Sequence, residues 1–65
     1  MKADTIRVRN SILTAAFDDV PPGDGGGYLA YTQQLPGAIS EGDTLEEARA
    51  NLADAVDNLL DTQSR

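Results

Sequence analysis

The 65-residue sequence contains no cysteine and no histidine. Without cysteine the chain has no thiolate for a disulfide or a metal site, which is typical of proteins from a reducing compartment. Without histidine, general acid–base chemistry is left to carboxylates, tyrosine or lysine, and Ser40 has no imidazole to activate it as a nucleophile. These absences predict a protein that is not an enzyme, and no metal or organic cofactor is expected.

Long apolar runs are also absent. No segment approaches the ~20 residues that a membrane-spanning helix needs, and the N-terminus lacks the basic-then-apolar pattern of a signal peptide. We therefore expect a cytoplasmic protein that does not contact membranes. A chain of this length forms one domain, residues 1–65. Because so small a domain is only marginally stable alone, oligomerisation is an expected source of support.

Basic residues are few, five against eleven acidic ones, and the formal net charge is −6. Lys2, Arg7 and Arg9 lie near the N-terminus, whereas between residues 41 and 61 Arg49 accompanies seven acidic side chains. Binding to nucleic-acid phosphates needs clustered lysine and arginine. The acidic half instead favours a basic partner, although a need for solubility accounts equally well for the charge.

The most informative stretch begins at Leu35-Pro36-Gly37. It predicts a tight turn in which proline sets φ at the first central position and glycine supplies a positive φ at the second. Residues 38–40 are then a short strand. Gly42 lies in a second break, where it is free to take a left-handed conformation.

A helix is predicted from Thr44 to Leu60. The Thr44 hydroxyl can accept a hydrogen bond from the N–H of Glu47, whose carboxylate reaches back to form a capping box. Asp43 with Glu46 is a competing cap one residue earlier. Apolar residues at spacings of three and four form one stripe, which predicts about four turns packed on a sheet: Leu45, Ala48, Leu52, Ala55, Val56 and Leu59. Leu60 lies at the edge of this stripe and is free to face a partner chain.

Two interpretations of the N-terminal part remain open. The one we favour is a single long strand from Ile6 to Phe17, bulged near Asn10. It rests on apolar and small residues that keep the same parity along the chain: Ile6, Val8, Ile12, Thr14 and Ala16. In the other, the first strand begins near Ser11 and residues 1–10 are an extension.

Residues 18–27 are predicted to form a polar hairpin loop, because they contain two prolines followed by glycines. A phosphate-binding loop is rejected, since no lysine follows and no helix begins there. The ligand spacing of a calcium loop is also missing. A carboxylate metal site that pairs Asp18 or Asp19 with Asp43 remains open.

Residues 28–34 are predicted to be the next strand, with Tyr28 and Tyr31 on opposite faces. The element order is therefore strand, strand, short strand, helix. This predicts an α+β fold with a small three-stranded antiparallel sheet and one helix packed on one face. The helix can cover only that face, so the other face is expected to stay open unless another chain covers it.

Several segments together resemble the HicB family of antitoxins. They are Gly-Tyr-Leu-Ala-Tyr at residues 27–31, Leu-Pro-Gly-Ala-Ile-Ser-Glu-Gly-Asp-Thr at 35–44, Glu-Glu-Ala at 46–48 and Asn-Leu at 51–52. The apolar helix end at residues 55–60 also fits. The resemblance covers about half of the chain closely, and the first strand and loop follow it only in pattern.

The resemblance implies a single HicB-like domain with a partial ribonuclease-H-like fold, usually with a short fourth strand. It also implies a protein that neutralises a HicA-type mRNA-cleaving toxin by protein–protein contact and that forms dimers or tetramers. The residues expected to contact the toxin are Tyr31, Glu41, Asp43 and Glu46, with Tyr28 and Leu29 as second choices.

Many family members carry a C-terminal DNA-binding domain, whereas this chain ends just after the predicted helix, so direct DNA binding is not expected. One alternative is a stand-alone homo-oligomeric HicB-like structural or binding domain with no toxin partner. Another is a nucleic-acid binder that uses residues 6–9 as a ribbon, but ribbon-helix-helix proteins need two helices after the strand.

Overall fold

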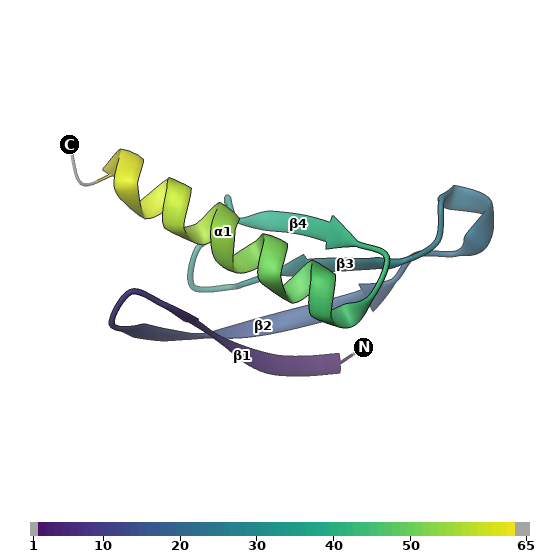
Figure 1. The fold of residues 1–65 in the computed structure, drawn as a ribbon, viewed down its shortest axis with the longest axis horizontal. Coiled ribbons are helices and arrows are strands. Elements are labelled where there is room, and N and C mark those ends of the chain that lie inside the picture. Colours follow the sequence, from purple (N-terminus) through teal and green to yellow (C-terminus); the bar gives the residue numbers. More distant parts are fainter. Residues whose placement is uncertain (1, 64–65) are drawn as a thin grey trace.

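The computed structural model describes residues 2–63. The elements are β1 (Lys2–Val8), β2 (Ser11–Asp19), the 3-10 turn η1 (Pro22–Asp24), β3 (Tyr28–Tyr31), β4 (Ile39–Gly42) and α1 (Leu45–Gln63). The four strands form one antiparallel sheet in the order β1-β2-β3-β4, and α1 lies across one of its faces (Figure 1). The predicted α+β class is confirmed, but the sheet has four strands rather than three.

The additional strand arises from a hairpin at Arg9 and Asn10. β1 pairs with β2 from Lys2 opposite Phe17 to Val8 opposite Ser11. Arg9 has a φ of 58°, and a positive φ in a two-residue turn matches the right-handed twist of the flanking strands. The favoured single strand across residue 10 is therefore wrong. The alternative placed the start of β2 correctly but missed that the first ten residues contribute a strand of their own.

The core lies between the helix and the sheet. It contains small and branched aliphatic side chains and the ring of Phe17, and they come from the strands, from the helix and, for Ala38, from the turn before β4: Ile6, Val8, Ala15, Phe17, Ala30, Ala38, Ala48, Leu52 and Val56. The predicted helix stripe is confirmed, because Ala48, Leu52 and Val56 are fully buried. Burying a side chain such as Leu52 contributes about 1.5–3 kcal/mol to stability. Leu60 is half-buried and packs against this core.

The Pro36-Gly37 turn is present, but its geometry differs from the prediction. The N–H of Ala38 donates to the carbonyl of Leu35 at 2.9 Å. Among the glycines of residues 2–63, positive φ is confined to Gly25, Gly26 and Gly27. The predicted positive φ at Gly37 is therefore wrong, since a turn can close between these residues with negative φ at both central positions.

Gly42 also lacks the left-handed backbone expected of it. A Cβ at this position would lie 2.5 Å from the amide nitrogen of Ala48. Glycine is needed here because β4 and the first turn of α1 approach each other closely. The Thr44 cap is confirmed, since the N–H of Glu47 donates to Thr44 Oγ1 at 3.1 Å and the helix begins at Leu45.

Side chains of α1 also bind the two outer strands. Arg49 Nε donates to the carbonyl of Thr5 on β1 at 3.1 Å, and Asn51 Nδ2 donates to the carbonyl of Glu41 on β4 at 2.9 Å. Unpaired carbonyls on edge strands invite pairing with other chains. The helix therefore satisfies one such carbonyl on each of the two edge strands.

Candidate protein-binding site

The face of the sheet opposite α1 carries a mixed apolar and charged surface. Arg7 points to this side because its neighbours Ile6 and Val8 are buried under the helix, and residues paired across strands share a face. The register therefore gathers these outward residues: Ala3, Thr5 and Arg7 on β1; Ile12, Thr14, Ala16 and Asp18 on β2; Leu29 and Tyr31 on β3; Ile39 and Glu41 on β4. We call this set the open face.

The open face holds both of the large apolar side chains that are strongly exposed among residues 2–63. Ile12 is 66% exposed and Ile39 is 58% exposed. Ile39 pairs with Tyr31, which pairs in turn with Ala16, so an apolar row crosses the middle of the face. Isolated exposed apolar residues are common, but a row on a sheet face is typical of a contact surface.

An acidic hollow of ≈ 430 Å³ adjoins one end of this face. The loop after β2, the end of β4 and the first turn of α1 meet there. Its lining includes four exposed carboxylates and the glycines between them: Asp24, Gly25, Gly26, Glu41, Gly42, Asp43 and Glu47. Glu41 belongs to both surfaces, so the open face and the acidic hollow are continuous.

Within residues 2–63, no group of three or more acidic side chains is placed to hold an ion. The acidic hollow is lined instead by carboxylates from separate segments, all of them exposed. Such a rim can accept the lysine or arginine side chains of a basic protein.

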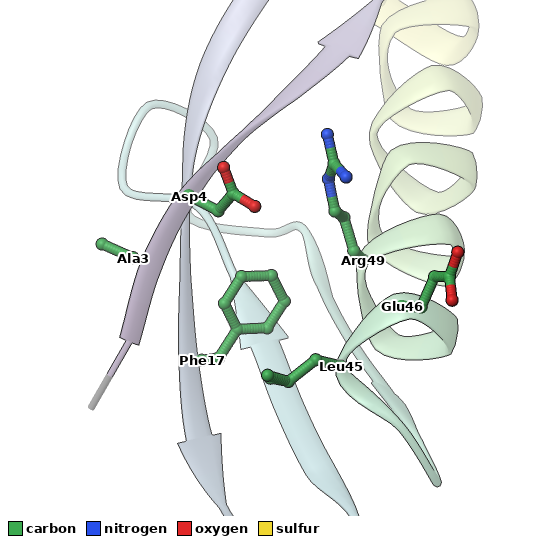
Figure 2. Close-up of a pocket in the computed structure, with 6 residues that line it drawn as sticks. All are labelled: Ala3, Asp4, Phe17, Leu45, Glu46 and Arg49. Carbon is green, nitrogen blue, oxygen red and sulfur yellow. The ribbon is translucent and has the colours of Figure 1, made fainter.

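A second hollow, of ≈ 330 Å³, lies between β1 and the start of α1. In Figure 2, Phe17 and Leu45 point into it, whereas the carboxylate of Glu46 points away. Two polar groups on its rim are already used by the fold, because Asp4 accepts from the N–H of Thr5 and Arg49 donates to the carbonyl of Thr5. The polar groups of this hollow therefore hold the β1 edge in place.

The six residues predicted from sequence to bind a partner do not form one surface. Leu29, Tyr31 and Glu41 share the open face, and Asp43 joins Glu41 at the acidic hollow. Tyr28 has the opposite parity on β3 and packs against the core beneath the helix. Glu46 lines the hollow beside β1.

Sequence reasoning missed several residues of these surfaces. Ile12 was placed on the same face as Ile6, because the single-strand interpretation carried one parity through residue 10. Asn10 was the available signal, since asparagine favours turns. A turn predicted at Asn10 would have reversed the parity of the strand that follows and so placed Ile12 on the open face. Asp24 and Glu47 line the same hollow as Asp43 only in the folded chain, and no local sequence pattern indicates this.

A separate ionic cluster joins the β1–β2 hairpin to the helix. Arg9 Nε lies 2.8 Å from Asp57 Oδ1, and Arg9 Nη2 lies 3.8 Å from Asp61 Oδ1. The hydrogen bond with Asp57 raises the pKa of Arg9, and the charges of Asp57 and Asp61 add to this effect. Because the carboxylates of Asp57 and Asp61 are paired with Arg9, the negative charge of the C-terminal half that is not offset by an ion pair lies mainly nearer the acidic hollow.

The fold and these surfaces define a small α+β domain with one helix-covered sheet face, one exposed sheet face and an acidic rim. The chain is similar to UPF0150 protein ssl0738 of Synechocystis sp., with 37% identity over 51 residues. The aligned region covers 78% of this chain and 61% of the relative, so the chain spans about three fifths of that protein's length. No family model and no solved structure matches the chain.

Within residues 2–63, α1 is not apolar enough to serve as a membrane-crossing helix.

Proposed function

We propose that this chain is a HicB-type antitoxin, a binding protein that neutralises a HicA-type mRNA-cleaving toxin by direct contact. The observation that carries the proposal is the acidic hollow. Four carboxylates from three segments of the fold line it. A protein that grips RNA phosphates presents lysine and arginine, and an acidic surface of matching shape can occupy them in place of RNA.

Two further features support the proposal. The motifs at residues 35–44 and 46–48 resemble those of the HicB family, and they build β4, the Thr44 cap and the first turn of α1. These are the segments that supply Glu41, Asp43 and Glu47 to the hollow. The part of the chain that carries the resemblance is therefore also the part that carries the acidic surface.

The contact we propose centres on Glu41 and Asp43. Glu41 pairs with Leu29 across β3 and β4, so an apolar side chain lies directly beside the acidic group. Apolar anchors next to charged groups are typical of protein interfaces, in which charge guides the encounter and apolar contacts supply affinity.

Co-expression tests the proposal. The chain is produced together with the small basic protein encoded beside its gene, and the pair is purified through a tag on the basic protein. We expect one complex in which cleavage of an mRNA substrate by the basic protein is suppressed. Failure to form a complex with an active ribonuclease partner would contradict the proposal and favour a stand-alone homo-oligomeric domain.

A further inference from the structure

A third hollow, of ≈ 310 Å³, lies along β1 next to the hollow drawn in Figure 2. Glu46 and Arg49 of α1 line both hollows, so the two form one groove between the outer strand β1 and the helix. We call it the edge groove. The lining of the third hollow is Ile6, Arg7, Glu46, Arg49, Ala50 and Ala53.

The backbone of β1 presents hydrogen-bonding groups along this groove. The N–H of Thr5 donates to Asp4 Oδ1 at 2.8 Å, and the carbonyl of Thr5 accepts from Arg49 Nε at 3.1 Å. Both groups of Thr5 therefore point away from β2. Because this orientation alternates along an antiparallel strand, Ala3 and Arg7 also direct their N–H and carbonyl groups outward. The edge of β1 thus offers a ladder on which another strand can pair.

The two hollows are spaced for the side chains of an extended segment. Asp4 and Ile6 lie on the helix side of β1, and one of them lines each hollow. They are two residues apart, which corresponds to ~7 Å along a strand. A strand beside β1 directs its own side chains to the same side at the same interval. Phe17 and Leu45 in one hollow, and Ile6 and Ala50 in the other, suit apolar side chains.

The charge of the edge groove favours an uncharged occupant. Its lining includes Asp4 and Glu46 together with Arg7 and Arg49, so opposite charges balance there, whereas the whole chain carries −6. Among residues 2–63, the edge groove and the acidic hollow have no lining residue in common. A segment bound in the groove therefore does not depend on the basic partner proposed for the acidic hollow.

We propose that the edge groove binds an extended, uncharged segment of another protein, which joins the sheet as a fifth strand beside β1. The backbone of the segment pairs with Ala3, Thr5 and Arg7. Two of its apolar side chains, separated by one residue, enter the two hollows. In strand addition of this kind, main-chain hydrogen bonds supply affinity and side-chain pockets supply specificity.

The side chains of Arg49 and Asp4 compete with such a segment. They bond the carbonyl and the N–H of Thr5, which are the groups at the centre of the ladder. An added strand has to displace both side chains before it can pair with Thr5. Loss of the Arg49 side chain is therefore expected to strengthen binding, although Arg49 lines the groove.

A peptide titration followed by NMR of the backbone amides tests the proposal. The probe is the acetylated and amidated peptide Ser-Thr-Val-Thr-Leu-Thr-Ser, which is neutral and carries two apolar residues separated by one threonine. At millimolar peptide, shifts are expected at the amides of β1 and of residues 45–53. The control peptide Ser-Thr-Thr-Val-Leu-Thr-Ser should bind roughly tenfold more weakly, because one apolar side chain then stays in water.

Variants of Thr5 separate strand addition from other modes of binding. Thr5→Pro removes an outward N–H, and an edge strand tolerates proline where the N–H faces away from the sheet. This variant should lose binding, whereas Thr5→Ala keeps the N–H and should bind as the wild type does. Arg49→Ala should bind severalfold more tightly. Ala50→Arg changes an exposed helix residue, fills the third hollow and should weaken binding, which gives a second blocking variant if Thr5→Pro does not fold.

Several outcomes would overturn the proposal. They are an absence of shifts in both the wild type and Arg49→Ala, shifts that lie outside the edge groove, and equal binding by folded Thr5→Pro and Thr5→Ala. Amides of β1 that shift with protein concentration alone would show that a second copy occupies the edge instead. Glu41→Lys should leave peptide binding unchanged, so a failure here is distinguishable from a failure of the proposed toxin contact.

Discussion

At the scale of single residues, Gly42 decides how closely the last strand and the helix approach each other. Ala48 N would lie 2.5 Å from a Cβ at this position, and the carbonyl carbon of Glu47 would lie 2.9 Å from it. Both atoms belong to the backbone and cannot rotate away. Since the same two segments supply Glu41, Asp43 and Glu47, this glycine also sets the shape of the acidic hollow.

Gly42→Ala is therefore expected to lower the free energy of unfolding by about 1–3 kcal/mol, as is typical of overpacking in a tight site. Thermal unfolding followed by circular dichroism measures the change. Gly37→Ala is the matched control, because its Cβ would meet Leu59 Cδ1 at 3.6 Å, an ordinary contact. Equal melting temperatures for the two variants would contradict this account of Gly42.

Thr44 gives a second prediction at this scale. Thr44→Ala removes the acceptor of the Glu47 N–H and is expected to cost about 1 kcal/mol of stability. Thr44→Ser retains the hydroxyl and should recover most of the loss. An alanine variant that unfolds at the wild-type midpoint in urea would show that the cap contributes nothing measurable.

These two residues show what the sequence could reveal locally. The Thr44 cap followed from a pattern four residues long, because a threonine and a glutamate at that spacing bond within one turn. The requirement for glycine at residue 42 could not be derived in that way. It depends on the distance between β4 and the backbone of α1, and that distance is set by the packing of the whole helix.

At the scale of elements, the β1–β2 hairpin and the end of the helix are joined by Arg9. Its guanidinium bonds Asp57 Oδ1 and approaches Asp61 Oδ1, and all three side chains are substantially exposed. Exposed ion pairs contribute little singly and are screened by salt. The contact is therefore expected to position the hairpin tip more than to stabilise the fold.

A double-mutant cycle measures this contact. Arg9→Gln and Asp57→Asn should each lower the melting temperature slightly at low salt, and the double variant should fall by less than the sum of the two shifts. At about 1 M salt, where the Debye length is ~3 Å, the two effects should become additive. Additive shifts at low salt as well would show that the two residues are not coupled.

The same hairpin shows where sequence reasoning was wrong at this scale. The helix was predicted because its stripe repeats over four turns, and three of its residues are fully buried. The hairpin was missed because Asn10 is the main compositional signal of its two-residue turn, and because the apolar parity continues through the turn by coincidence. Since Ile6 pairs with Leu13, the parity in fact reverses at the turn.

At the scale of the whole molecule, the fold separates three kinds of surface. The helix-covered face holds the core, the open face holds exposed apolar residues with nearly balanced charge, and the acidic hollow concentrates negative charge beside the helix start. The sequence indicated the acidic half and an uncovered sheet face. It could not show that Glu41 and Asp43 lie together with Asp24, because that depends on the loop after β2.

The most direct measurement of the proposed function is the affinity of the chain for the basic ribonuclease, compared among charge-reversal variants. Glu41→Lys and Asp43→Lys are expected to weaken binding roughly tenfold or more each and to restore RNA cleavage, because like charges then face each other at the acidic hollow. Asp54→Lys, an exposed carboxylate farther along α1, should bind as the wild type does. Equal losses in all three variants, or none in the first two, would contradict a toxin contact at this site.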